Sequence, residues 1–135
     1  MINQAMETEN DLAQTYVNRA NAYLDDRQYD MAISECTKAI QLDPHLYIAY
    51  INRASACSMK GQYDLAINDC NLAIQLESDL PLAYLSRGMA YRSLGRKTEA
   101  LDDFEKFITI ANSSQLIEIA KKQIEELSQH PDPSV

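Results

Sequence analysis

The chain has 135 residues, of which 46% are hydrophobic and 24% charged, and its formal net charge is −8. This composition is typical of a globular domain with a core of its own. The excess of negative charge argues against a nucleic-acid partner, because phosphates are bound by clusters of Lys and Arg. With only 3 Gly and 4 Pro, little interrupts helical backbone, and we expect an all-α fold.

The sequence shows no pattern typical of a secretion signal or of a membrane-spanning segment. No basic stretch is followed by an apolar core at the start, and no apolar run reaches membrane-spanning length, so we expect neither secretion nor membrane insertion and a cytoplasmic location. Cys36, Cys57 and Cys70 are odd in number and lack CxxC spacing, which favours reduced, buried thiols in a reducing compartment.

A 34-residue repeat organises most of the chain. The stretch YVNRANAY at 16–23 returns as YINRASAC at 50–57 and as YLSRGMAY at 84–91. Residues 13–46, 47–80 and 81–114 superpose without a gap, with large and small side chains at fixed positions. Such a period is the signature of a stacked helical array.

The expected elements follow in chain order. Residues 1–11 are predicted to be an N-terminal tail. Apolar residues at helical spacing then predict two helices in each block, at 12–25 and 29–42, at 46–59 and 63–76, and at 80–93 and 97–111. Gly61 and Gly95 stand where a helix end favours a left-handed residue, and Pro81 suits a first helical turn.

The segment after the third block predicts a seventh helix, at 113–128. Its apolar positions recur at helical spacing, and we expect it to cap the open end of an array that spans 12–112. The predicted inward face consists of Leu116, Ile119, Ala120, Gln123, Ile124 and Leu127. Residues 129–135 are expected to be a C-terminal tail.

The repeat resembles that of the tetratricopeptide repeat (TPR) family, over about 100 of the 135 residues. The pattern of aromatic and small residues is carried by Tyr16, Ala20, Tyr23, Tyr29, Ala32, Ala39, Pro44, Tyr50, Ala54, Tyr63, Ala66, Ala73, Tyr84, Gly88, Tyr91, Ala100 and Phe104. The third block differs from the first two at position 27, where Phe107 replaces Ala39 and Ala73. The resemblance implies a right-handed α-α superhelix, a short solenoid of three helix-turn-helix repeats and a capping helix.

The resemblance also implies a concave groove, lined by the first helix of each repeat, that binds another protein or a peptide. The site residues expected from it are Val17, Asn21, Leu24, Ile48, Ile51, Asn52, Ser55, Met59, Leu82, Leu85 and Met89. This strip is largely apolar, which suits an amphipathic helix or an extended hydrophobic peptide. We therefore expect an adaptor, scaffold or assembly factor.

One branch of the family, the heat-shock co-chaperones, holds a peptide carboxylate with three cations and two asparagines. Asn21 and Asn52 match the two asparagines, but Val17, Leu82 and Ser86 stand where the cations are expected. We predict that an EEVD-type chaperone tail binds weakly or not at all, because charge-assisted hydrogen bonds to its carboxylate are missing. A co-chaperone with a modified clamp stays an alternative.

Self-association, a disulfide and an anion site have less support from the sequence. A homo-oligomer, or the chain's own N-terminal segment, would bury the groove by self-contact. The family fold would bring Cys57 near Cys70, so a disulfide is conceivable, and the basic residues Arg87, Arg92, Arg96 and Lys97 are a minor candidate for an anionic partner. His45 and His130 lack a second ligand at metal spacing, and no catalytic motif is present, so we expect no metal, no cofactor and no enzymatic activity.

Overall fold

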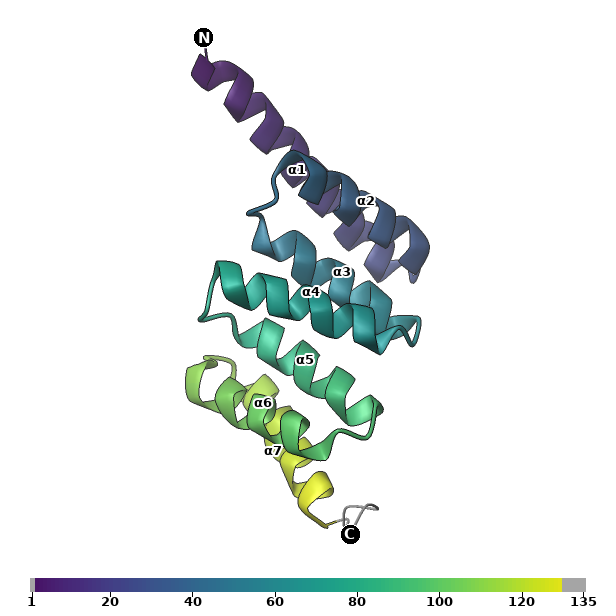
Figure 1. Ribbon diagram of the computed structural model, residues 1–135, viewed down its shortest axis with the longest axis vertical. Coiled ribbons are helices and arrows are strands. Elements are labelled where there is room, and N and C mark those ends of the chain that lie inside the picture. Colours follow the sequence, from purple (N-terminus) through teal and green to yellow (C-terminus); the bar gives the residue numbers. More distant parts are fainter. Residues whose placement is uncertain (1, 130–135) are drawn as a thin grey trace.

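The computed structural model describes residues 2–129, with side chains described from Thr8 onward, and this part of the chain forms seven helices and no strand. The helices are α1 (Ile2–Asp25), α2 (Tyr29–Leu42), α3 (Tyr47–Met59), α4 (Tyr63–Leu76), α5 (Pro81–Ser93), α6 (Lys97–Ile110) and α7 (Ser114–Gln129). Figure 1 shows them stacked in chain order along the long axis, with α1 and α7 at opposite ends. The all-α prediction is confirmed.

Small residues at repeated positions allow the two helices of each pair to approach closely. Ala20, Ala54 and Ala66 are completely buried. In the second pair, Ala54 and Cys57 of α3 pack against Ala66 and Cys70 of α4. A single helix cannot bury its apolar stripe alone, and the stack supplies the missing cover.

The turns follow the backbone preferences expected from the sequence. Gly61 and Gly95 adopt φ of 76° and 75° after α3 and α5, as predicted for left-handed residues at helix ends. Arg27, at the same place in the first repeat, has φ of 61°, a conformation that costs a residue with a Cβ more than it costs glycine. Pro81 opens α5, also as predicted.

The N-terminal tail expected at 1–11 is wrong for the described residues, because α1 begins at Ile2. This part of α1 projects beyond the stack in Figure 1. The sequence from 2 to 11 has no Gly or Pro to end a helix, so the helix continues outward from the anchored part of α1. The C-terminal tail predicted at 129–135 lies outside the described residues, apart from Gln129, which ends α7.

The capping helix α7 covers the last repeat with a face that differs in part from the predicted one. Ala120 is buried against Phe104 and Phe107 of α6. Leu116, Ile117, Ile124 and Leu127 pack around this cluster. Ile119 was expected on the inward face but is exposed. Ile117 packs against the cluster instead. The face of α7 that contacts α6 is therefore rotated about the helix axis, away from Ile119 and toward Ile117.

Candidate functional site

A groove runs across the first helices of the second and third repeats, α3 and α5. It has a volume of about 360 Å³. Its lining residues are Ile48, Ile51, Asn52, Ser55, Ser58, Met59, Leu82, Leu85, Ser86 and Met89. Every residue that we predicted for the site from α3 and α5 lies in this groove.

The predicted residues of the first repeat lie outside this set. Val17 is buried between Ala39 and Ala49, so its expected role as an accessible contact is wrong. The reason is that α3 packs over this position of α1. Asn21 is exposed and its Oδ1 accepts a hydrogen bond of 2.8 Å from Nδ2 of Asn52, and Leu24 is half-buried.

Two serines of the groove were absent from the predicted set. Ser58 stands at position 12 of its repeat, which the family pattern already places on the concave side. Ser86 was expected only as the replacement for a clamp cation. Both positions could have been found by comparing each repeat position in all three copies.

The groove lining is mainly apolar and carries no charge. Met59, Leu82 and Met89 are 62%, 50% and 40% exposed, although long apolar side chains are usually covered. None of the ten lining residues carries a charge, in a chain of which 24% is charged. A charged ligand group would lose its hydration here without gaining an ionic partner.

In the second and third repeats, the recurring tyrosine and arginine lie at the seam with the preceding repeat. Arg53 donates from Nε and Nη2 to the two carboxylate oxygens of Asp69, both at 2.8 Å, and from Nη1 to Thr37 of the preceding repeat at 3.2 Å. The hydrogen bonds to Asp69 raise the pKa of Arg53 above its ordinary value. Its guanidinium also lies 5.8 Å from the ring centroid of Tyr50.

Arg87 repeats this arrangement one step further along the array. It donates to Asp103 at 2.8 and 2.7 Å and to Asn71 of the preceding repeat at 2.8 Å, and it lies 5.4 Å from the ring centroid of Tyr84. Planar two-point pairing is specific to Arg among the cations. The recurring Arg therefore fixes the register of one repeat on the next.

The basic residues expected as a candidate for an anionic partner are largely paired with carboxylates. Arg92 lies 3.0 Å from Glu126 of α7, and Arg96 lies 2.6 Å from Glu99. With Arg87 bound to Asp103, these guanidiniums are already neutralised. The arrangement does not favour an anion site.

The three cysteines are buried free thiols. Burial raises the pKa of Cys36 to about 12 and that of Cys70 to about 11, and it raises the pKa of Cys57 as well. Thiolate is the reactive form, and a raised pKa lowers its fraction at neutral pH. These thiols are core residues of low reactivity.

Neither a metal-binding cluster nor a membrane-spanning helix is found in the described part of the chain. Among the described side chains, Thr8 to Gln129, no group of three or more His, Cys, Asp and Glu residues is placed to hold a metal ion. None of the described helices combines the length and the apolar character that crossing a membrane would require.

Two family models of the tetratricopeptide repeat match this chain, one over residues 13–46 and the other over residues 47–80 and 82–114. The helix pairs, their stacking and the concave groove described above are those of a helical-repeat solenoid. The chain belongs to the tetratricopeptide repeat family, with three tandem repeats and a C-terminal capping helix.

Solved TPR domains share this fold. The first TPR domain of Spaghetti (RPAP3), bound to the HSP90 peptide SRMEEVD, is 30% identical with a TM-score of 0.82, over 89% of this chain and 93% of that chain. The TPR domain of Arabidopsis OM64 is 27% identical with a TM-score of 0.82, over 87% and 98%.

The second TPR domain of human RPAP3, in complex with the HSP70 peptide SGPTIEEVD, is 26% identical with a TM-score of 0.77, over 91% and 98%. No curated sequence is significantly similar to this chain. The fold and family are those of protein–protein interaction modules.

Proposed function

We propose that this protein is an adaptor or scaffold that binds an amphipathic helix or an extended hydrophobic peptide of another protein in its concave groove. The observation that carries the proposal is the continuous strip of partly exposed apolar side chains on α3 and α5, with no charge among them. The proposed contact residues are Ile48, Asn52, Ser55, Met59, Leu82, Leu85 and Met89, and Ile51, which is only 5% exposed, forms part of the floor beneath them. From the first repeat we include Asn21, which is hydrogen-bonded to Asn52, and the half-buried Leu24 as further proposed contacts.

The apolar strip supplies the driving force for binding. Covering Met59, Leu82 and Met89 would remove apolar surface from water, which contributes about 25 cal/mol per Å² before the cost of association is subtracted. Methionine adapts to partners of different shape. Asn52, Ser55 and Ser86 offer hydrogen bonds that orient the bound segment.

The groove chemistry favours an apolar ligand over a chaperone carboxylate. The asparagines that match the co-chaperone clamp, Asn21 and Asn52, are hydrogen-bonded to each other. Val17 is buried, and Leu82 and Ser86 carry no charge. RPAP3 domains bind chaperone peptides, whereas we expect this chain to bind SRMEEVD weakly or not at all.

The test uses exposed groove positions, so that the fold is retained. Leu82→Glu/Met89→Glu should weaken binding of a Leu-faced amphipathic helical peptide by about ten-fold or more, because burying an uncompensated carboxylate is costly. Met31→Glu/Leu65→Glu is the matched control, since both side chains are exposed apolar residues of α2 and α4. Isothermal calorimetry with this peptide and with SRMEEVD measures both affinities.

Two results would overturn the proposal. Equal affinities of the groove variant and the control would place the peptide elsewhere. Tighter binding of SRMEEVD than of the apolar peptide would favour a co-chaperone with a modified clamp. Light scattering over a concentration series tests the homo-oligomer alternative, which predicts a dimer that Leu82→Glu/Met89→Glu dissociates.

A further inference from the structure

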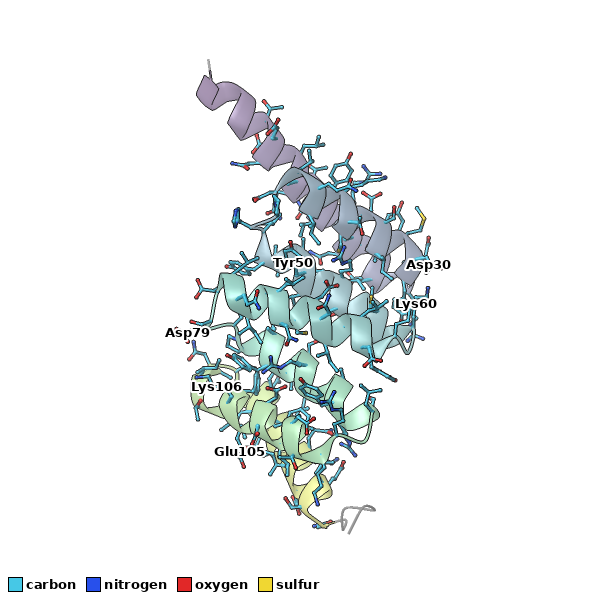
Figure 2. The ribbon with its side chains drawn as sticks, viewed as in Figure 1. Asp30, Tyr50, Lys60, Asp79, Glu105 and Lys106 are labelled. Carbon is cyan, nitrogen blue, oxygen red and sulfur yellow. The ribbon has the colours of Figure 1, made fainter. Side chains whose placement is uncertain are left out.

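The two internal seams of the array are built from the same stripe of residues on α3 and α5. On α3 the stripe is Ala49, Arg53, Ala56 and Lys60, and on α5 it is Ala83, Arg87, Ala90 and Leu94. Ala49 packs in one cluster with Ala39 of the preceding repeat, and Arg53 bonds to Thr37. Lys60 forms an ion pair with Asp30, and Figure 2 shows the two side chains at the same edge of the molecule.

The spacing of these residues places them on one helix face, three or four positions apart. Ala56 and Ala90 are buried within this face. A small residue at this point lets the second helix of the preceding repeat approach closely. The stripe is therefore a docking surface for a helix, occupied by α2 on α3 and by α4 on α5.

The same stripe exists on α1, where none of the helices within residues 2–129 packs over it. Its residues are Thr15, Arg19, Ala22 and Asp26, and all four are exposed. The side chain of Arg19 is 53% exposed, against 23% for Arg53 and 21% for Arg87. Ala22 leaves room for close approach, as Ala56 and Ala90 do in the internal seams.

Arg19 contacts an aromatic ring and a buried carboxylate, as its copies do, but without their two-point hydrogen bonding to the carboxylate. Its guanidinium lies 5.6 Å from the ring centroid of Tyr16 and 3.4 Å from the buried carboxylate of Glu35. Arg53 and Arg87 each bond in addition to a polar side chain of the preceding repeat. Among the side chains described, from Thr8 to Gln129, none forms the corresponding hydrogen bond with Arg19.

We propose that the free face of α1 formed by Thr15, Arg19, Ala22 and Asp26 docks a helix of a partner protein, in the way that α3 docks α2. The charges of the face define the partner. Asp26 stands where Lys60 stands in the second repeat, so the partner helix carries Lys or Arg where α2 carries Asp30. Seven residues later, at the place of Thr37 in α2, the partner helix carries Ser, Thr or Asn. The side-chain oxygen of that residue accepts a hydrogen bond from Arg19.

A second copy of this chain fits the face poorly. Antiparallel pairing of two α1 helices about Arg19 would place Arg19 of both copies against each other, and like charges in an interface oppose association. The other end of the array offers no open second helix, because α7 covers Phe104 and Phe107 of α6. The free face of α1 is separate from the concave groove of α3 and α5. The proposal for this face can therefore be tested independently of the proposed function.

The probe is a stapled 14-residue helical peptide with the sequence of α2, carrying Asp30→Lys and Cys36→Ala. The staple is needed because free helices of this length are marginal in water. Fluorescence anisotropy should show binding of this peptide, and about ten-fold weaker binding of the same peptide with Asp30 retained, since close charge pairs couple strongly at interfaces. Asp26→Lys in the protein should reverse that preference.

Variants of the protein locate the binding face. Ala22→Gln should weaken binding by about ten-fold or more through steric exclusion, with an unchanged melting temperature because Ala22 is exposed. Ser34→Gln, at an exposed position of α2, and the groove variant Leu82→Glu should leave the affinity unchanged.

Three outcomes would overturn the proposal. The first is no binding of the Asp30→Lys peptide, and the second is binding that Ala22→Gln leaves intact. The third is a dimer in light scattering that Ala22→Gln dissociates, because the face would then be occupied by a second copy.

Discussion

The two ends of the array meet their surroundings in different ways. At the C-terminal end, Phe104 and Phe107 are completely buried in a cluster to which α5, α6 and α7 all contribute. At the N-terminal end, Arg19 and Ala22 of α1 are exposed, although their copies Arg53 and Ala56 are half-buried and buried. In a repeat array, therefore, the place in the stack decides what is covered, rather than the residue type.

The greatest loss of stability is expected at the closed end. Phe104→Ala should lower the free energy of unfolding by roughly 3–5 kcal/mol, because the ring is fully buried between α5, α6 and α7 and its loss leaves a cavity. Urea denaturation measures the change. Leu101→Ala, on the same helix but half-exposed, is the control and should cost less. Equal losses would contradict the full burial of Phe104 at this end of the array.

The recurring Arg should matter more inside the array than at its open end. Arg53→Met leaves the buried Asp69 without its partner and should cost about 2–4 kcal/mol, less than a fully buried pair because Arg53 is partly exposed. Arg19→Met should cost only about 1 kcal/mol, since Arg19 contacts Glu35 less closely and binds no preceding repeat. Denaturation of both variants tests this ranking, and a larger loss for Arg19→Met would contradict it.

Gly88 tests how the closed end accommodates its large ring. A Cβ at Gly88 would lie 2.8 Å from Cε1 of Phe104, so Gly88→Ala overpacks the site by roughly 1–3 kcal/mol against a helix-propensity gain of about 1 kcal/mol. We expect a net loss of up to about 2 kcal/mol.

In a Phe104→Cys background, Gly88→Ala should instead stabilise by about 1 kcal/mol. That pair reproduces the Ala54 and Cys70 combination of the second repeat. A double-mutant cycle measures the coupling. Additive effects would show that Gly88 and Phe104 do not share one space.

The open face should respond least to substitution. Ala22→Gln should change the free energy of unfolding by less than about 0.5 kcal/mol, as exposed substitutions usually do. Ala56→Gln, the same change in a buried seam, should destabilise clearly, because it forces a polar side chain between α2 and α3. Thermal melting of the two variants makes the comparison, and a substantial loss for Ala22→Gln would mean that α1 is covered in solution.

Much of the fold could be predicted from the sequence, because the pattern that defines each helix pair occurs three times along the chain. The second helices at 29–42 and 63–76 have the predicted bounds. The N-terminal extension of α1 was missed, since nothing in its composition distinguishes a solvated helix from a tail. Ile119 was placed on the inward face in error. Ile117 and Ile119 are both apolar, and only the angle at which α7 packs on α6 decides which of them is covered.

The groove could be predicted in part. The family register placed Ile48, Leu82 and Met89 on the concave side, and the structure gathers them in one groove. Val17 and Ile51 are buried, with 1% and 5% of their surface exposed, whereas Leu85 at the same repeat position is half-buried. Repeat position gives the direction of a side chain, and the neighbouring helix decides whether it reaches solvent.

The period, the seven helices, the positions of Gly61 and Gly95 and the family follow from the sequence alone, because they depend on local spacing and backbone preference. The partners of Arg53 and Arg87, the burial of Val17 and the exposure of the face from Thr15 to Asp26 emerge only in the folded array. Burial and ion pairing depend on both neighbours in the stack. Identical letters in three copies have different neighbours at the ends and in the middle.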